Sequence, residues 1–296
     1  MACVTIRGRK TGRREADGSK QELLNSIMSF RKYRTSIVAF VLVALAISTS
    51  FLASSTRADQ PKELTAEQIV EAVILVSGTR PGLAQIRKNG IERGRMSRMT
   101  SDGHPEEARY ELRFVHGDKI EKDKIRIDQK TAQQEYSLIN SEGRVFGIIN
   151  GSLFTPRAET TAEFLSQQIH SIDALLRYKE NDSKITSAGK DKQRGIDLHV
   201  IDLVDKANHK TRYFVSAKSY RVLWLEYEET TPDQTTPVKF MKRFYDYRYA
   251  QGTLVPYRTV TLIDGKQLLE TRILTVTYGI KMEDSLFQNP ESASGN

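Results

Sequence analysis

The sequence TLIDGKQL at residues 261–268 places an Asp-Gly pair between two apolar runs. This arrangement predicts a two-residue hairpin turn, in which both turn residues take positive φ angles. Such a turn would pair Leu262 with Gln267. Two residues further from the turn, Val260 would pair with Leu269. The two faces of the hairpin would then differ, as in an antiparallel sheet with one solvated face. The predicted apolar face consists of Val260, Leu262, Leu269 and Ile273.

The same pattern of short apolar runs and turns extends over most of the chain. The sequence FGIINGSLF at residues 146–154 contains a second hairpin turn, Asn-Gly. The spacing between the expected strands is too short for crossover helices, which favours an antiparallel meander. Further strands are expected at 85–99, 109–115, 124–128, 135–139, 195–204, 212–216, 221–227 and 238–249.

Two segments have helical periodicity. The sequence TAEQ at residues 65–68 resembles a capping box, and apolar residues follow it at helical spacing until Gly78 and Pro81 end the run. A second helix is expected at 160–178, where apolar residues form one stripe. Covering a face of the sheet is its simplest role.

An uncharged stretch at residues 36–55 follows Arg31, Lys32 and Arg34. With the small residue Ala58 behind it, this stretch predicts a signal peptide at 28–58 that starts at Met28. The alternative is an uncleaved inner-membrane anchor through residues 37–53. Residues 1–27 are then a non-structural N-terminal extension, and residues 59–296 form a single domain.

The charge is concentrated before the predicted cleavage site. Residues 1–58 carry 10 Lys and Arg against 3 Asp and Glu, whereas the remainder carries 35 against 34. This balance lacks the basic footprint of a nucleic-acid-binding protein, so no nucleic-acid partner is expected. The only cysteine is Cys3, so the exported part has neither a disulfide nor a lipid attachment site.

A search for catalytic motifs gives no candidate. The chain lacks the common zinc, nucleophile-elbow and phosphate-loop motifs. Ser187 and Lys190 match a short serine-enzyme pattern without its partner motifs, and the charged run at 118–124 is typical of a solvated turn. The five histidines are scattered and are expected at surfaces or edges. We therefore expect no catalytic residue, no metal and no cofactor.

Aromatic residues are concentrated in the later strands. Strand alternation places Tyr245, Tyr247 and Tyr249 on one face and Phe240 and Phe244 on the other. Core packing is the simpler explanation, and lining of a ligand cavity is the alternative. The candidate lining residues are Trp224, Phe244, Tyr245, Tyr247, Val260, Leu262 and Ile273.

Four motifs in the last third of the chain carry a family resemblance. They are FYDYR at 244–248, GTLVP at 252–256, DGK at 264–266 with Glu270, and MEDSLF at 282–287 with Pro290. Their order and spacing resemble the closing strands of the outer-membrane lipoprotein-sorting (LolA/LolB-like) superfamily. The resemblance implies an α+β fold, in which a strongly curved antiparallel sheet forms an unclosed barrel around one or two helices. It also implies a hydrophobic cavity that holds acyl chains.

These observations together predict a periplasmic carrier or sensor of a lipid or lipoprotein acyl chain. Envelope membrane proteins are further candidate partners, and no chemical turnover is expected. Two alternatives stay open at this point: an envelope interaction module whose core is filled by side chains, and an envelope enzyme of unknown class.

Overall fold

The computed structural model describes residues 63–100, 102–230 and 236–289. From Glu63 onward the chain forms one compact unit. The predicted extension at 1–27, the signal peptide at 28–58 and the alternative anchor at 37–53 lie outside the described residues. Among the described residues, no single helix passes the length and hydropathy test for a membrane span, and one pair of helices, Ala66–Ser77 and Arg80–Ile86, passes it only across a 50° bend.

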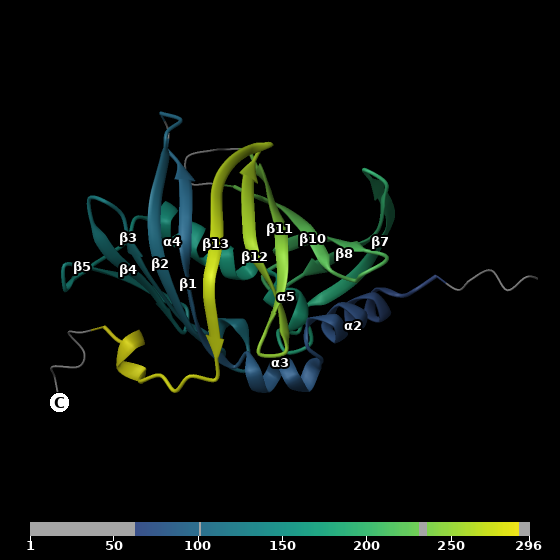
Figure 1. The fold of residues 1–296 in the computed structure, drawn as a ribbon, viewed down its shortest axis with the longest axis horizontal. Helices are drawn as coiled ribbons and strands as arrows, with labels where there is room; N and C mark the ends of the chain where they lie inside the picture. Colours follow the sequence, from purple (N-terminus) through teal and green to yellow (C-terminus); the bar gives the residue numbers. More distant parts are fainter. Residues whose placement is uncertain (1–62, 101, 231–235, 290–296) are drawn as a thin grey trace, which may run out of the picture. The chain divides into compact units, whose positions relative to one another are not determined.

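One antiparallel sheet of 13 strands dominates the described residues (Figure 1). Its order is β6-β5-β4-β3-β2-β1-β13-β12-β11-β10-β9-β8-β7. The strands are β1 (Asn89–Met99), β2 (Pro105–Val115), β3 (Lys124–Lys130), β4 (Glu135–Ser141), β5 (Arg144–Ile149), β6 (Ser152–Phe154), β7 (Lys184–Gln193), β8 (Ile196–Val204), β9 (Lys210–Ser216), β10 (Val222–Glu229), β11 (Val238–Ala250), β12 (Thr253–Ile263) and β13 (Lys266–Tyr278).

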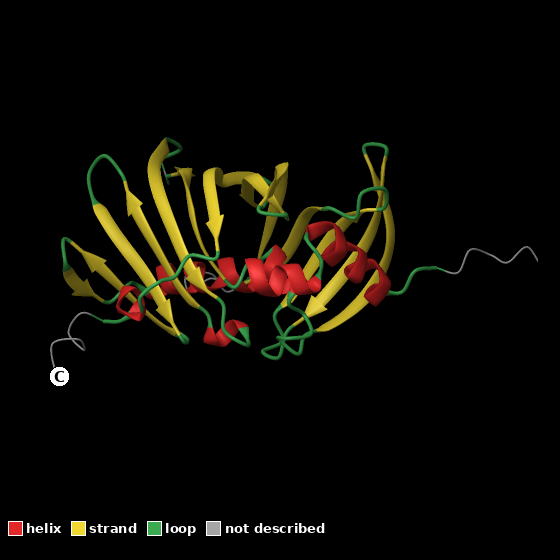
Figure 2. Ribbon diagram, turned by 60° about the horizontal axis from the view of Figure 1, so that its bottom comes forward, coloured by secondary structure: helices red, strands yellow, loops and turns green. Residues whose placement is uncertain are grey.

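The topology places the first and last strands side by side in the middle of the sheet. Its two free edges, β6 and β7, are consecutive in the chain. The chain therefore crosses from one edge to the other through α4 (Ala158–Ile169) and α5 (Ile172–Leu176). Figure 2 shows α4 and α5 inside the arc of strands, so the sheet is an unclosed barrel, as the family resemblance implied.

The first helix, α2 (Ala66–Ser77), begins as predicted. Thr65 is its N-cap, and the side chain of Gln68 completes the capping box. Gly78 ends α2 with a φ of 138°. The expected strand at 85–99 starts too early, because a further helix, α3 (Arg80–Ile86), follows at once with Pro81 in its first turn, a position that proline tolerates.

The expected single helix at 160–178 is wrong, because the segment is broken between α4 and α5. His170 ends α4, and the hydroxyl of Ser171 accepts a hydrogen bond from the backbone N–H of Ala174 to start α5. Lys242 of β11 donates to the carbonyl oxygen of His170 over 2.7 Å. A side chain from the sheet therefore satisfies the free carbonyl oxygen at the break between α4 and α5. With α2 and α3, the described residues contain four separate α-helices.

Both predicted hairpin turns are confirmed. Asn150 and Gly151 take φ angles of 51° and 79°, and Asp264 and Gly265 take 46° and 80°. Leu262 also pairs with Gln267, as expected.

The predicted pairing of Val260 with Leu269 is wrong. A bulge leaves Leu268 without a partner, so Val260 lies opposite Glu270. The bulge allows both Leu268 and Leu269 to pack in one apolar cluster. Val260 and Leu262 therefore share a face with Glu270 rather than with Leu269.

The last described element of the chain packs on the outer face of the sheet. The short 3-10 helix η2 (Asp284–Phe287) contacts β3 and β4. Arg126 of β3 donates to the carbonyl oxygen of Leu286 over 3.2 Å, and Lys124 forms an ion pair with Asp284 at 2.9 Å. Only 1% of Phe287 is exposed. Residues 284–287, from the last motif of the sequence resemblance, therefore cover part of the outer face of β3 and β4.

Candidate binding site

Strand register defines the inner face of the first half-sheet, β1–β6. Residues directly opposite each other on antiparallel strands share a face, so the pairings can be followed from strand to strand. One such row starts at Val276 of β13, crosses Glu92 and Leu112, and ends at Phe154 of β6. The complete row is Val276, Glu92, Leu112, Ile127, Leu138, Gly147 and Phe154.

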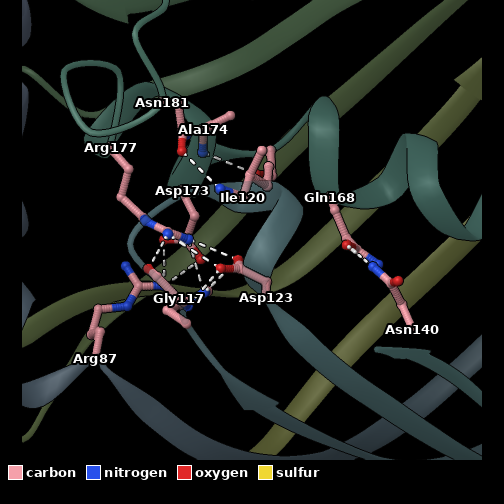
Figure 3. A network of polar contacts seen from close by, with 12 residues as sticks. Arg87, Gly117, Ile120, Asp123, Asn140, Gln168, Asp173, Ala174, Arg177 and Asn181 are labelled. Atoms are coloured by element: carbon pink, nitrogen blue, oxygen red, sulfur yellow. Dashed lines mark hydrogen bonds and ion pairs between the residues drawn. The ribbon is translucent and has the colours of Figure 1, made fainter. Parts of the chain in front are cut away.

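Helix α4 lies over this face. Asn140 of β4 donates to Gln168 of α4 over 3.1 Å (Figure 3), and Arg98 of β1 pairs with Glu163. Phe164 packs in a core cluster with Phe114 and other strand residues. Polar contacts on two sides of α4 thus hold it against the half-sheet.

The packing under α4 is loose. Ser166 is its only buried residue. The apolar residues Phe164, Leu165 and Ile169 all keep partly exposed surface. Packed interiors normally leave little such surface on the core side of a helix, so α4 is packed less tightly than a fully buried helix.

A cluster of apolar strand residues continues beyond α4. Its members come from β1, β2, β3 and β13, and no described helix contributes a side chain to it. The cluster, called the uncovered cluster below, consists of Met96, Ala108, Tyr110 and Leu269, with Leu112, Ile127 and Leu268 packed against it. Leu112 also packs in the cluster of Phe164. The uncovered cluster is therefore continuous with the apolar residues under α4, and the two together are called the apolar groove below.

Two glycines on the inner face leave space for aromatic rings from the neighbouring strands. A Cβ atom at Gly94 would come within 2.6 Å of the Tyr110 ring, and one at Gly147 would come within 2.2 Å of the Phe154 ring. Both rings can therefore lie on the backbone of the neighbouring strand. The hydroxyl of Tyr110 donates to Glu92 over 2.6 Å, while burial raises the pKa of Glu92 against the opposing effects of Tyr110 and Arg87.

A buried polar network holds the C-terminal end of α4. The ring of His170 is 1% exposed, and its Nε2–H donates to Glu229 over 3.0 Å because a carboxylate can only accept. Its Nδ1 is 2.7 Å from the Thr211 hydroxyl, which donates to it. The hydroxyl of Ser166 donates to the second carboxylate oxygen over 2.8 Å. Every polar atom of the ring is thus satisfied.

Lys242 completes this network from the sheet. It is 4% exposed, and burial lowers its pKa to about 7, against the attraction of Glu229 and then Glu163. Burial also lowers the pKa of His170, an effect that its hydrogen bond to Glu229 opposes. Tyr227 stacks on the His170 ring at 3.8 Å. This network, called the α4 anchor below, therefore contains two bases, His170 and Lys242, that burial holds toward their neutral forms.

A second polar network lies where α3 and α5 approach the loop after β2. Arg177 donates to both carboxylate oxygens of Asp123, at 2.7 and 3.2 Å, and to the carbonyl oxygen of Gly117 at 2.9 Å. Arg87 pairs with Asp173 at 2.9 Å. Figure 3 shows both guanidinium groups turned toward these carboxylates. Burial acts to raise the pKa of Asp173, but the charges of Arg87, His116 and Arg177 hold it below its ordinary value.

Comparison with solved structures identifies this arrangement of sheet and helices. The LolA superfamily protein from Nitrosomonas europaea superposes with a TM-score of 0.54 at 12% sequence identity, over 77% of this chain and 100% of that chain. A DUF1329 family protein from Desulfovibrio piger superposes with a TM-score of 0.53 at 11% identity, over 76% of this chain and 98% of that chain. This chain has the LolA-like fold. No family model and no curated protein sequence matches it.

Within the LolA-like fold, three of the seven predicted lining residues pack on the side of the helices. Phe244 and Tyr247 belong to the core cluster formed with α2 and α5. Ile273 packs beside Phe164 of α4. Asp246, with a φ of 52°, separates Tyr245 from Tyr247. This conformation interrupts the alternation on which the sequence prediction relied.

The other four lie elsewhere in the LolA-like sheet. Trp224 stacks on Phe214 at 4.5 Å, in a separate cluster on the outer face. Tyr245 lies under Arg258, 4.9 Å from the guanidinium carbon to the ring centre. Val260 and Leu262 share the face of Glu270, as described above. A ligand-binding role remains a prediction for all seven residues, and of these only Ile273 packs in the cluster of Phe164 under α4.

Sequence analysis missed the residues that build the groove and its anchors. Leu112 and Ile127 occupy ordinary strand patterns that contain no ligand signal. His170 was expected at a surface or edge but is buried, and Asp123, from the run expected to be a solvated turn, is 2% exposed. Partners distant in sequence bury both side chains. A lysine among aromatic residues, as at Lys242, is the one local feature that could have indicated a buried charge.

Proposed function

We propose that the protein is an exported carrier or sensor that holds the apolar chain of a lipid or lipoprotein in the groove between α4 and the first half-sheet, without chemical turnover. The observation that carries this proposal is the uncovered cluster, to which no described helix contributes an apolar side chain and in which Leu112, Ile127 and Leu268 stay partly exposed beside buried strand residues. The LolA-like fold of the protein from Nitrosomonas europaea supports the same class of function.

The energetics favour an aliphatic ligand. Each methylene group that moves from water into an apolar site contributes about 0.8 kcal/mol. Leu112, Ile127 and Leu268 keep partly exposed surface in the free protein. A chain laid along them would bury this surface and its own at the same time. Their strand positions are fixed by the sheet, so little ordering of the protein opposes binding.

Helix α4 is suited to act as the cover of the groove. Its attachments are mostly polar contacts near its ends and along one side, whereas its apolar side chains are only partly buried. A small outward shift of α4 would therefore cost few apolar contacts. Export follows from the predicted signal peptide, and it agrees with a carrier that works between membranes.

Ligand binding can be tested with two matched variants. Ile127→Glu places a carboxylate in the groove, and Ile148→Glu makes the same change on the outer face, where Ile148 lies opposite Ser137. Both isoleucines are partly exposed. Titration of cis-parinaric acid, followed by its fluorescence, should show at least about tenfold weaker binding for Ile127→Glu, because the carboxylate must be desolvated. Ile148→Glu should bind like the wild type.

Native mass spectrometry of detergent-free protein complements this titration. A co-purifying lipid mass that is present in the wild type and in Ile148→Glu, but absent in Ile127→Glu, would support the proposal and name the ligand class. Equal probe binding by both variants would overturn the location of the groove. A wild-type protein that binds neither a lipid nor the probe would favour the alternative of a filled interaction module.

A further inference from the structure

A second hollow lies away from the apolar groove, between α3, α5 and the loop after β2. Its volume is about 480 Å³. Leu83, Ala84 and Leu176 give it an apolar wall, and four cationic side chains and one histidine surround this wall. The charged lining consists of Arg80, Arg87, Lys88, Arg177 and His116, with Asp118, Asp173 and Glu180 as the acids.

Two of the three lining acids are already neutralised. Asp173 pairs with Arg87 at 2.9 Å, and Glu180 pairs with Arg80 at 3.2 Å. Arg177 is neutralised by Asp123, which lies behind the hollow and is 2% exposed. Lys88 and Asp118 remain, both exposed and without an ion pair among the described residues.

Hydrogen-bond donors are left over at this hollow. The Nε atom of Arg87 is buried and has no hydrogen-bond partner. An unsatisfied buried donor is costly, so such a group indicates a missing acceptor. The guanidinium of Arg87 also lies 5.7 Å from the centre of the Tyr278 ring, which together with Asp173 limits its movement.

His116 presents a further nitrogen. Its Nδ1 lies 2.7 Å from Asp123 Oδ2 and 3.0 Å from Nη1 of Arg177. Arg177 holds the same carboxylate in place at 2.7 Å. No described residue forms a hydrogen bond with Nε2 of the ring. The orientation of His116 is therefore fixed by one nitrogen while the other is free.

We propose that this hollow binds a phosphate group, with Lys88 and Arg87 as its donors, the ring of His116 beside them and the apolar wall next to the substituent that carries the phosphate. Phosphate oxygens accept several charge-assisted hydrogen bonds at once, which suits two adjacent cationic side chains at the end of α3. Leu83 and Leu176 favour a phosphate attached to an apolar body, as in a lipid headgroup. Binding of a phosphate group at this hollow does not depend on the proposed lipid-carrier function. Only the identification of that phosphate as a lipid headgroup rests on it.

Isothermal titration calorimetry on the exported domain can separate the possible sources. The probes are dihexanoyl phosphatidic acid, inorganic phosphate and uncharged dihexanoylglycerol. Binding of phosphatidic acid alone would identify a headgroup site, and binding of both phosphate probes would identify a site for the phosphate group itself. Either result supports the proposal. Equal binding of dihexanoylglycerol and phosphatidic acid, or no binding of either phosphate probe, would overturn it.

Charge variants provide the second test. Lys88→Gln should weaken binding of phosphatidic acid about three- to tenfold, a range that allows for solvent screening of an exposed charge. Asp118→Asn should strengthen binding about twofold to threefold because it removes a repulsive charge at the same hollow. Lys192→Gln, an exposed change on β7, is the control and should have no effect. Unchanged affinity in both Lys88→Gln and Asp118→Asn would refute the assignment.

The two proposals fail in different ways. Loss of cis-parinaric acid binding in Ile127→Glu reports on the apolar groove, and Lys88→Gln should leave that binding unchanged. All residues substituted at the hollow are exposed, so thermal unfolding should show folded variants in each case.

Discussion

The buried lysine of the α4 anchor gives the sharpest prediction. Lys242 has a pKa of about 7 in the folded protein, below its ordinary value of 10.5, because burial opposes its charge. Between these two values the unfolded chain binds more protons than the folded chain, so stability must rise with pH through this window. We expect Lys242→Met, which keeps a long unbranched side chain, to abolish this rise.

The magnitude follows from the two pKa values. Raising the pH from about 7 to about 9.5 removes the proton from folded Lys242, whereas the unfolded chain keeps most of it, which adds about 3 kcal/mol to the free energy of unfolding. The variant also leaves the carbonyl oxygen of His170 without its donor. That loss costs about 1–3 kcal/mol, but it does not depend on pH and shifts the whole curve.

Urea unfolding at several pH values measures this effect. The difference between wild type and Lys242→Met should grow by about 3 kcal/mol from pH 7 to pH 9.5. Lys239→Met is the matched control, because Lys239 lies on the same strand and 53% of its side chain is exposed. Its curve should run parallel to that of the wild type. Parallel curves for Lys242→Met as well would refute the conclusion that burial depresses the pKa of this lysine.

Two further substitutions test the packing. Phe287→Ala should cost about 3–4 kcal/mol of unfolding free energy, since it empties a buried site on the outer face; a change below about 1 kcal/mol in urea unfolding would contradict the docking of η2. Arg177→Met leaves the buried carboxylate of Asp123 without its cation, and a loss of about 3–5 kcal/mol is expected. The double variant Arg177→Met with Asp123→Leu should recover much of this loss, and failure to recover would show that Arg177 acts through other contacts.

Local chemistry explains what the sequence predicted. The turns at Asn150-Gly151 and Asp264-Gly265 require positive φ angles that these residue types supply, and the capping box at Thr65 uses contacts within one helical turn. The LolA-like fold was also within reach, because its closing motifs lie in one continuous stretch of the sequence.

The groove could not be predicted in this way, because distant contacts define it. The bulge at Leu268 depends on a cluster built from four strands, and it reverses the faces expected for Val260 and Leu262. His170 gives no local sign that Thr211 and Glu229 surround it. Candidate residues chosen by alternation were therefore placed on the wrong side wherever a bulge or a positive φ interrupted the strand.

The adjacency of β1 and β13 has a consequence for folding. These strands join the two half-sheets by hydrogen bonds, and the only other chain connection between the half-sheets is the segment of α4 and α5. Pairing Ile91 with Thr277 closes a loop of about 180 residues, at an entropic cost of about 5 kcal/mol. Each half is a meander of neighbouring strands and can form early, whereas this central seam must wait for both. We expect the seam to set the folding rate, so the groove beneath α4 takes shape only in the last step.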